Sequence, residues 1–179
     1  MKMRRLLLIA LLLLSSGCAT FSGSGPDTED PLIASSHQTV DDLLQNIPSG
    51  KELNRRQPII VASLVNIDDL NSSRLGRMVA EQLATRLTQK GYSVVELKLR
   101  DSIFVRQSQG ELLLSREIKD ITLSHKAQAV LVGTYAESRG ALYLTVKLVG
   151  VGDNVAISAV DYSLPLGSDV RAMLWNGPQ

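Results

Sequence analysis

The segment from Pro58 to Val65 constrains the fold of this chain more than any other feature. It is an almost unbroken apolar run in which β-branched residues are frequent. A strand with one wet face alternates apolar and polar residues, whereas a continuous apolar run of this length is typical of a strand buried on both faces. Ala129–Tyr135 has the same character. The sequence therefore predicts two strands that are covered on both sides of their sheet.

Helical and extended patterns surround these two runs. The other predicted elements are helices over 40–47, 75–87 and 115–123, strands over 92–99, 142–149 and 155–164, and a β-hairpin over 102–114. Residues 169–175 are predicted to form a short helix or a frayed tail. Helices that alternate with apolar strands predict a sheet with a parallel part, and the last two strands predict an antiparallel edge. The predicted class is α/β, with α+β left open. We expect a mixed sheet with helices packed on it, in two or three layers.

The start of the chain has the pattern of an export signal. Lys2, Arg4 and Arg5 form a positive head, and Leu6–Leu14 is an apolar core that is too short to span a bilayer as a helix. Small residues then precede Cys18, the only cysteine of the chain. This arrangement resembles a bacterial lipoprotein signal, in which the thiol is acylated after cleavage. It departs from the usual pattern at the third residue before the cysteine, which is serine here, so an ordinary secretory signal stays open.

Composition and charge limit the function of the processed chain. The protein has 179 residues and a formal net charge of +1, which becomes −2 when 1–17 and their three basic residues are removed. No basic stripe with interleaved aromatic residues is present, so we expect no nucleic-acid binding. With one cysteine, no disulfide can form within the chain.

The chain divides into four predicted segments. Residues 1–17 are the signal peptide and 18–35 a lipidated tether rich in Ser, Gly and Pro; 36–165 form the folded domain and 166–179 a short C-terminal tail. The tether would average roughly 23 Å as a flexible coil. In the tail, Trp175 is expected to dock on its own domain. The only expected non-protein group is the lipid on Cys18; no metal or other cofactor is predicted.

One candidate ligand site follows the first buried strand. Asp68 and Asp69 come directly after it, where open α/β sheets tend to bind ligands. The next residues, Ser72-Ser73-Arg74 and then Arg77, could hold an anion at a helix start. The alternatives are a solvated loop and a serine helix cap, with Gly76 allowing close packing, and we favour these.

The remaining candidates carry no catalytic pattern. His37 and His125 are the only histidines, and no nucleophile-elbow motif is present. Gly133-Thr134-Tyr135 ends a strand and is interpreted as packing, with a contact role for Tyr135 as the alternative. We therefore predict that the protein is not an enzyme.

Several short segments, in this order, resemble the FlgO family. They are 59–70, 75–83, 100–102, 114–117 and 130–135, and they follow the lipoprotein signal. The resemblance implies an outer-membrane lipoprotein with its domain in the periplasm, without catalysis, that helps to build or stabilise flagella. It implies partners among flagellar basal-body or other envelope proteins, besides the membrane and further copies of the chain. Only Cys18 transfers as a functional residue, for lipidation.

Two other classes of function stay open from the sequence. One is a subunit of an envelope transport complex, because the domain is weakly similar to curli-export lipoproteins. The other is a periplasmic domain that binds a small ligand beside Asp68 and Ser72. A pocket with perturbed carboxylates at that place would favour the second class.

Overall fold

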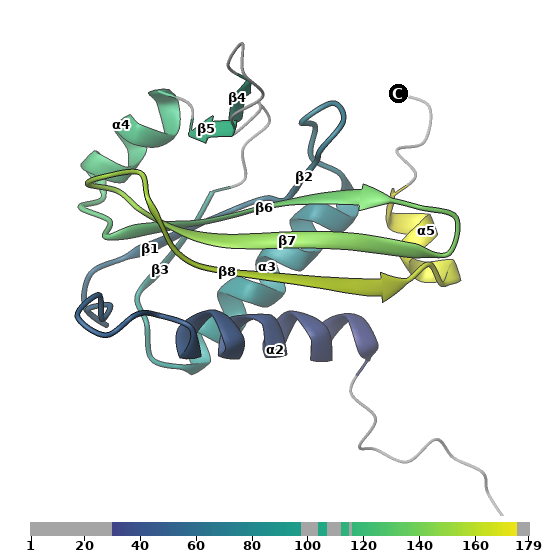
Figure 1. Ribbon diagram of the computed structural model, residues 1–179, viewed down its shortest axis with the longest axis horizontal. Helices are drawn as coiled ribbons and strands as arrows, with labels where there is room; N and C mark the ends of the chain where they lie inside the picture. Colours follow the sequence, from purple (N-terminus) through teal and green to yellow (C-terminus); the bar gives the residue numbers. More distant parts are fainter. Residues whose placement is uncertain (1–29, 98–103, 107–111, 115, 175–179) are drawn as a thin grey trace, which may run out of the picture.

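The computed structural model describes residues 30–97, 104–106, 112–114 and 116–174 (Figure 1). The helices are α2 (Pro31–Gln45), α3 (Arg74–Gln89), α4 (Arg116–Ser124) and α5 (Ser168–Leu174). The strands are β1 (Ile59–Ala62), β2 (Val65–Asn66), β3 (Val94–Leu97), β4 (Phe104–Arg106), β5 (Leu112–Leu114), β6 (Ala129–Glu137), β7 (Ala141–Gly150) and β8 (Ala156–Pro165). The predicted order of elements is confirmed, including the antiparallel hairpin of β4 and β5.

One mixed sheet organises the domain. Its main path runs β3-β1-β6-β7-β8, and the short β2 pairs with β6 beyond the end of β1. β1 is parallel to both β3 and β6, whereas β7 and β8 continue the sheet in antiparallel fashion. The antiparallel C-terminal edge is therefore confirmed. The fold is a mixed α+β arrangement, the class that the sequence left open beside α/β.

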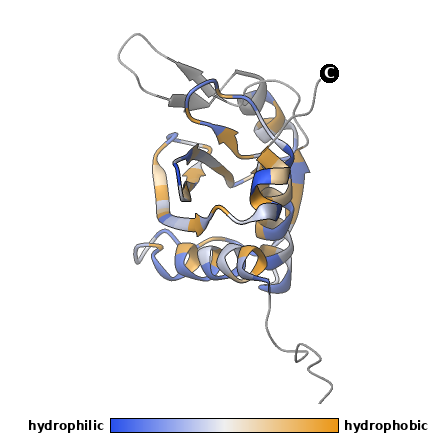
Figure 2. Ribbon diagram, turned by 90° about the vertical axis from the view of Figure 1, so that its right-hand side faces the viewer, coloured by the Kyte–Doolittle hydropathy of each residue, from blue (hydrophilic) through white to orange (hydrophobic). Residues whose placement is uncertain are grey.

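The two faces of the sheet bury separate sets of side chains. On one face, α2 and α3 lie side by side, and Val40, Leu75 and Leu83 pack against strand residues such as Val61 and Leu131. On the other face, Val130 and Val132 belong to a smaller apolar cluster that Ile121 of α4 contacts. Hydrophilic and hydrophobic residues alternate around the coils of the helices, as amphipathic packing requires (Figure 2).

The second face is covered over only part of the sheet. Val61 and Val132 are almost fully buried, as predicted for central strands. On β7, by contrast, Tyr143 is 57% exposed and Lys147 is also exposed. The sheet is thus the middle of three layers around β1 and β6, and one of two layers around β7 and β8. Each of the two arrangements that the sequence left open holds for one half of the sheet.

The long apolar run is one strand in sequence but two in the structure. The break falls at Ser63 and Leu64, between β1 and β2. There the backbone N–H of Leu64 donates to the carbonyl of Gly76 at 3.1 Å, so this stretch binds α3 in place of a neighbouring strand. The apolar pattern of the sequence cannot show whether this backbone pairs with a strand or with α3, because the apolar side chains are buried in either case.

The first helix begins earlier than its apolar spacing predicts, and the short C-terminal helix is present as α5. α2 begins at Pro31, so residues 31–35 are helical and not part of a tether. The sequence carries the signal for this start, because Asp30 caps the helix through a bond from Leu32 N at 2.9 Å and proline stands at the first helical position. At the other end, Leu166 and Val170 are buried in the main apolar cluster. Trp175 lies outside the described residues.

Candidate functional site

Asp68 and Asp69 follow β2 in a loop whose shape is fixed by hydrogen bonds within the loop. Asp69 Oδ1 accepts a bond from Asn71 N, and Asn66 Oδ1 accepts one from Asp68 N, both at 2.8 Å. The backbone closes the same turn through Asn66 N and the carbonyl of Asn71 at 2.9 Å. Short polar side chains that bond to backbone two residues on are typical of turns. This geometry favours the loop-forming interpretation over a ligand site.

At the start of α3, the candidate serine and glycine serve helix capping and packing. Ser73 is buried, and its Oγ accepts from Gly76 N at 3.0 Å, which is the predicted helix cap. A Cβ on Gly76 would lie 2.1 Å from the carbonyl oxygen of Leu64. Glycine is therefore needed for the close approach of α3 to the strand break, as predicted. Arg74 and Arg77, the two cations of the anion-site hypothesis, are exposed.

Gly133 and Tyr135 serve the packing between β6 and its neighbours. A Cβ on Gly133 would lie 2.8 Å from both Leu64 Cγ and the carbonyl oxygen of Thr145. Tyr135 is 4% exposed and its ring lies beside Gly76. Burial raises the pKa of its hydroxyl, which lies near Ser73. These contacts support the packing interpretation and leave little of Tyr135 for a partner to touch.

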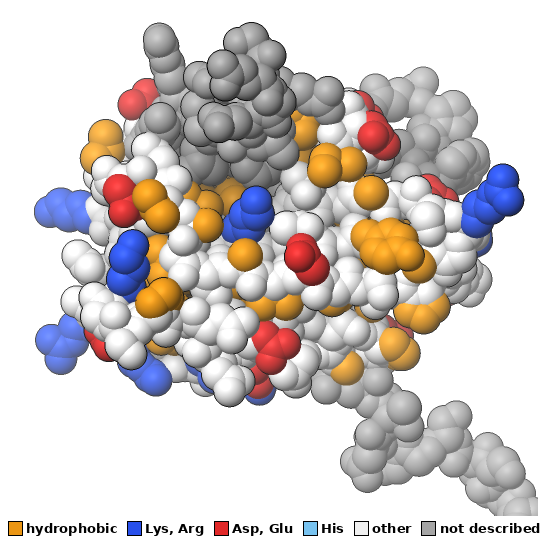
Figure 3. Space-filling model, in the orientation of Figure 1, with side chains coloured by type: hydrophobic (Ala, Val, Ile, Leu, Met, Phe, Trp, Pro, Cys, Tyr) orange, Lys and Arg blue, Asp and Glu red, His pale blue; other side chains and the backbone are white. Residues whose placement is uncertain are grey.

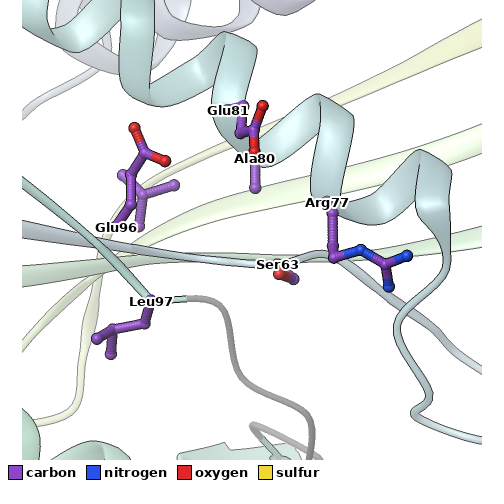
Figure 4. A pocket seen from close by; sticks show the side chains of 7 residues that line it. Ser63, Arg77, Ala80, Glu81, Glu96 and Leu97 are labelled. Carbon is purple, nitrogen blue, oxygen red and sulfur yellow. The ribbon is translucent and has the colours of Figure 1, made fainter.

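The crevice where ligands tend to bind in such sheets is almost closed. It lies between α3 and the carboxyl ends of β1 and β3, and Ser63, Arg77 and Glu96 are among the residues that line it (Figure 4). Glu96 and Leu97 point to opposite sides of β3, so only Glu96 turns toward α3 (Figure 4). The space amounts to about 10 Å³, which is room for at most one water. The described part of this crevice has no room for a small organic ligand.

The histidines lie on elements that cover opposite faces of the sheet. His37 is in α2, and His125 follows α4, whose Ile121 packs on the other face. Within the described residues, no three His, Cys, Asp or Glu side chains come together in a way that could hold a metal ion. Cys18 lies outside these residues, so its lipidation stays a prediction.

Two grooves run along α2 where it meets β8, and sequence reasoning missed both. One, of about 450 Å³, lies between the start of α2, α3 and α5, and its apolar lining includes Met78, Leu164 and Met173. The other, of about 390 Å³, lies between α2 and the middle of β8. Each groove combines segments that are more than a hundred residues apart in the chain, so no local pattern could have shown them.

The second groove has both polar and apolar groups in its lining. Its walls are formed by residues 34–42 of α2 and by residues 160–163 of β8. Beneath it, Ser36 donates to Gln82 Oε1 and Thr39 donates to the carbonyl of Ser35, both at 2.8 Å. The Tyr162 hydroxyl is buried beside them, and burial raises its pKa to about 12. It makes no hydrogen bond of acceptable geometry within the described residues.

The face shown in Figure 3 has no single-sign electrostatic field. Lys, Arg, Asp and Glu side chains are interspersed there with isolated hydrophobic ones (Figure 3). Interspersed charge of this kind does not form the basic footprint of nucleic-acid binding.

None of the described helices combines the length and the apolar character needed to cross a bilayer.

Known structures share the fold of this chain. The C-terminal domain of LpoB from Salmonella enterica matches with a TM-score of 0.55 at 19% sequence identity, over 75% of this chain and 98% of that chain. The C-terminal domain of LpoB from Escherichia coli matches with a TM-score of 0.52 at 16% identity, over the same shares. At such identities the likeness establishes the fold alone. No curated protein sequence matches the chain significantly.

A family model identifies the domain more specifically. The model of the FlgO protein matches residues 37–169, a range that runs from α2 into α5 and includes every strand of the main sheet. This match spans most of the chain and agrees with the segments that resemble the family in sequence. The protein therefore belongs to the FlgO family.

Proposed function

We propose that this protein is an outer-membrane lipoprotein that supports the assembly or stability of flagellar structures through surface contacts, without catalysing a reaction. The observation that carries the proposal is the FlgO family match over residues 37–169, most of the folded domain. The site geometry agrees with it, because the carboxylates and serines that could have formed a reactive centre are engaged in turns, caps and packing. No observation favours the transport or small-ligand alternatives.

The anchor in this proposal is Cys18 and the segment that follows it. Since α2 begins at Pro31 and is capped by Asp30, residues 19–29 would link the lipidated cysteine to the domain. Such a linker reaches at most ~36 Å when extended and averages about 18 Å as a flexible coil. One acyl chain binds membranes only marginally, whereas several hold firmly. Ala19, and not aspartate, follows the cysteine, which favours sorting to the outer membrane.

Gene deletion and complementation in a flagellated host test this proposal. We expect deletion to weaken motility or flagellar retention, and the wild-type gene to restore it. Cys18→Ser should abolish labelling by a fatty-acid analogue, release the protein from the outer-membrane fraction and fail to complement. The double variant Asp68→Asn with Asp69→Asn serves as the control and should complement.

Three results would count against the proposal. Equal fatty-acid label in the wild type and in Cys18→Ser would reject the anchor. An unchanged flagellar phenotype after deletion would reject the role. Failure of the Asp68 and Asp69 variant, with folding and abundance intact, would instead favour ligand binding at that loop.

A further inference from the structure

β8 is a long edge strand with few of the features that protect such edges. It spans Ala156–Pro165 and pairs with β7 on one side, with no strand on the other side among the described residues. Natural edge strands are usually shielded by lysines, prolines, bulges, short length or a covering helix, and here α2 packs along β8 but leaves a groove beside residues 160–163. β8 has no lysine, its proline is the last residue, and the irregular register at Leu148 and Val149 lies opposite its first residues. The stretch from 158 to 164 is regular.

The groove beside this stretch leaves room for another chain. It measures about 390 Å³ and separates residues 160–163 of β8 from α2. Val160 and Tyr162 are partly buried on the side of α2, whereas Asp161 and Ser163 are exposed on the opposite side. A strand added at the usual spacing of about 4.8 Å would alternate in the same way. One set of its side chains would lie next to Val160 and Tyr162, and the other set next to Asp161.

The groove between α2 and β8 has negatively charged side chains in its lining, which favours a positively charged partner. Asp42 of α2 and Asp161 of β8 both line it, and no Lys, Arg or His does so. Asp42 Oδ1 accepts from Gln38 at 2.7 Å and Asp161 Oδ1 accepts from Thr145 at 2.6 Å. The second oxygen of each carboxylate has no hydrogen-bond partner in the described part of the chain. A lysine or arginine on an incoming strand would meet complementary charge.

A second copy of the chain fits this groove less well. Pairing two copies along β8 would bring Asp42 and Asp161 of both into one seam that has no cation in its lining. Like charges that face each other across strands are destabilising.

We propose that β8 and α2 together bind an extended basic segment of another protein, which adds to the sheet as a strand next to β8. Its lysine or arginine side chains would lie beside Asp161, with the Asp42 carboxylate across the same groove, and its small apolar side chains would lie over Val160 and Tyr162. This inference names the partner chemistry and so rests on the proposed contact role.

The test uses the processed chain, purified in mild detergent, and two labelled ten-residue peptides. Lysine and valine alternate in one, and glutamate and valine in the other. We expect only the lysine peptide to bind, measured by fluorescence anisotropy, and hydrogen exchange to slow in β8. The double variant Asp42→Asn with Asp161→Asn should bind it roughly tenfold more weakly, as the loss of two charge contacts implies. The matched control, Asp68→Asn with Asp69→Asn, removes the same charge elsewhere and should bind like the wild type.

Other results would overturn the inference. They are absence of binding by either peptide, equal binding of both, exchange protection confined to other elements, or an equal loss in the two double variants. Slowed exchange in β8 that follows protein concentration without peptide would assign the edge to a second copy. Because the assay contains no flagellar component, its failure would leave the complementation result of the proposed function unaffected.

Discussion

The two halves of the sheet are built from similar residues and yet have different surroundings. In the parallel half, formed by β3, β1 and β6, apolar clusters cover both faces. In the antiparallel half, β7 and β8 bury Leu144, Val146 and Leu164 on one face. Their other face carries Tyr143, Lys147 and Asp161 and buries Val149 only near the end of β7. Chain connectivity explains the difference, because parallel strands need crossover helices, whereas antiparallel strands are joined by tight turns.

The parallel half should therefore provide most of the stability of the domain, and the antiparallel half most of its surface for partners. Side chains covered on both faces hold the domain together, and their loss should reduce the free energy of unfolding. The open face and the free edge of β8 contribute less to stability and remain accessible to partners. α2 packs on the antiparallel half and α3 on the parallel half, so the contacts between these two helices join the halves.

The largest effect is expected for Leu83→Ala in α3. Leu83 is fully buried against the parallel half, and removing its side chain leaves a cavity. The variant should lose about 2–5 kcal/mol of unfolding free energy, measured by chemical denaturation. A loss below about 0.5 kcal/mol, which is typical of exposed positions, would contradict the assignment of this half as the stable core.

A smaller loss is expected for Gly76→Ala. Alanine is the better helix former, but here its Cβ would lie 2.1 Å from the Leu64 carbonyl oxygen. Overpacking against backbone should cost about 1–3 kcal/mol in the same assay. Gly140→Ala is the matched control, because no atom lies within 4 Å of its added Cβ. Equal stability of the two variants would show that α3 can shift away from the strand break at little cost.

The ion pair between the helices should contribute less, and only above acidic pH. Arg86 binds both carboxylate oxygens of Asp41, at 2.6 and 3.0 Å, and Lys90 lies 3.0 Å away. The hydrogen bond from Arg86 is the main reason that the pKa of Asp41 falls from 3.8 to about 2. The folded state therefore favours the ionised carboxylate. This stabilisation is present above the unfolded pKa and is lost as the pH falls through about 2.

Asp41→Asn should therefore lose at most about 1 kcal/mol at pH 7, since the pair is partly exposed to solvent. The difference between the variant and the wild type should shrink toward zero near pH 2. Denaturation curves at several pH values measure it, with Asp42→Asn as the control for a carboxylate that faces the groove. A difference that stays constant down to pH 2 would mean that the charge of Asp41 does not stabilise the contact between α2 and α3.

The smallest effect is expected on the open face of β7. Tyr143 is 57% exposed, and Tyr143→Thr keeps a residue that suits a strand. The change in unfolding free energy should stay within about 0.5 kcal/mol. A loss as large as that of Leu83→Ala would show that this face is covered in the folded protein, and the contrast between the halves would fail.

Several structural features could be predicted from local residue patterns. The continuous apolar runs predicted central strands because both faces of a parallel strand are buried, and Val61 and Val132 confirm it. A serine cap at the start of α3 was predicted because a hydroxyl there satisfies a free N–H, and Ser73 provides it. Gly76 and Gly133 were interpreted correctly as packing positions because glycine permits close approach of backbone.

Other features depended on contacts between distant segments. The apolar run was broken because Leu64 binds the backbone of α3. The early start of α2, by contrast, has a local cause in Asp30 and Pro31, which the apolar spacing alone does not show. The sequence by itself determined that helices pack on a mixed sheet with an antiparallel C-terminal edge, the order of the strands along the chain and the absence of a catalytic motif, since these follow from local periodicity and residue chemistry. Only the tertiary structure decided which half of the sheet stays open and where α2 and β8 leave a groove, because both depend on how helices far apart in sequence share one surface.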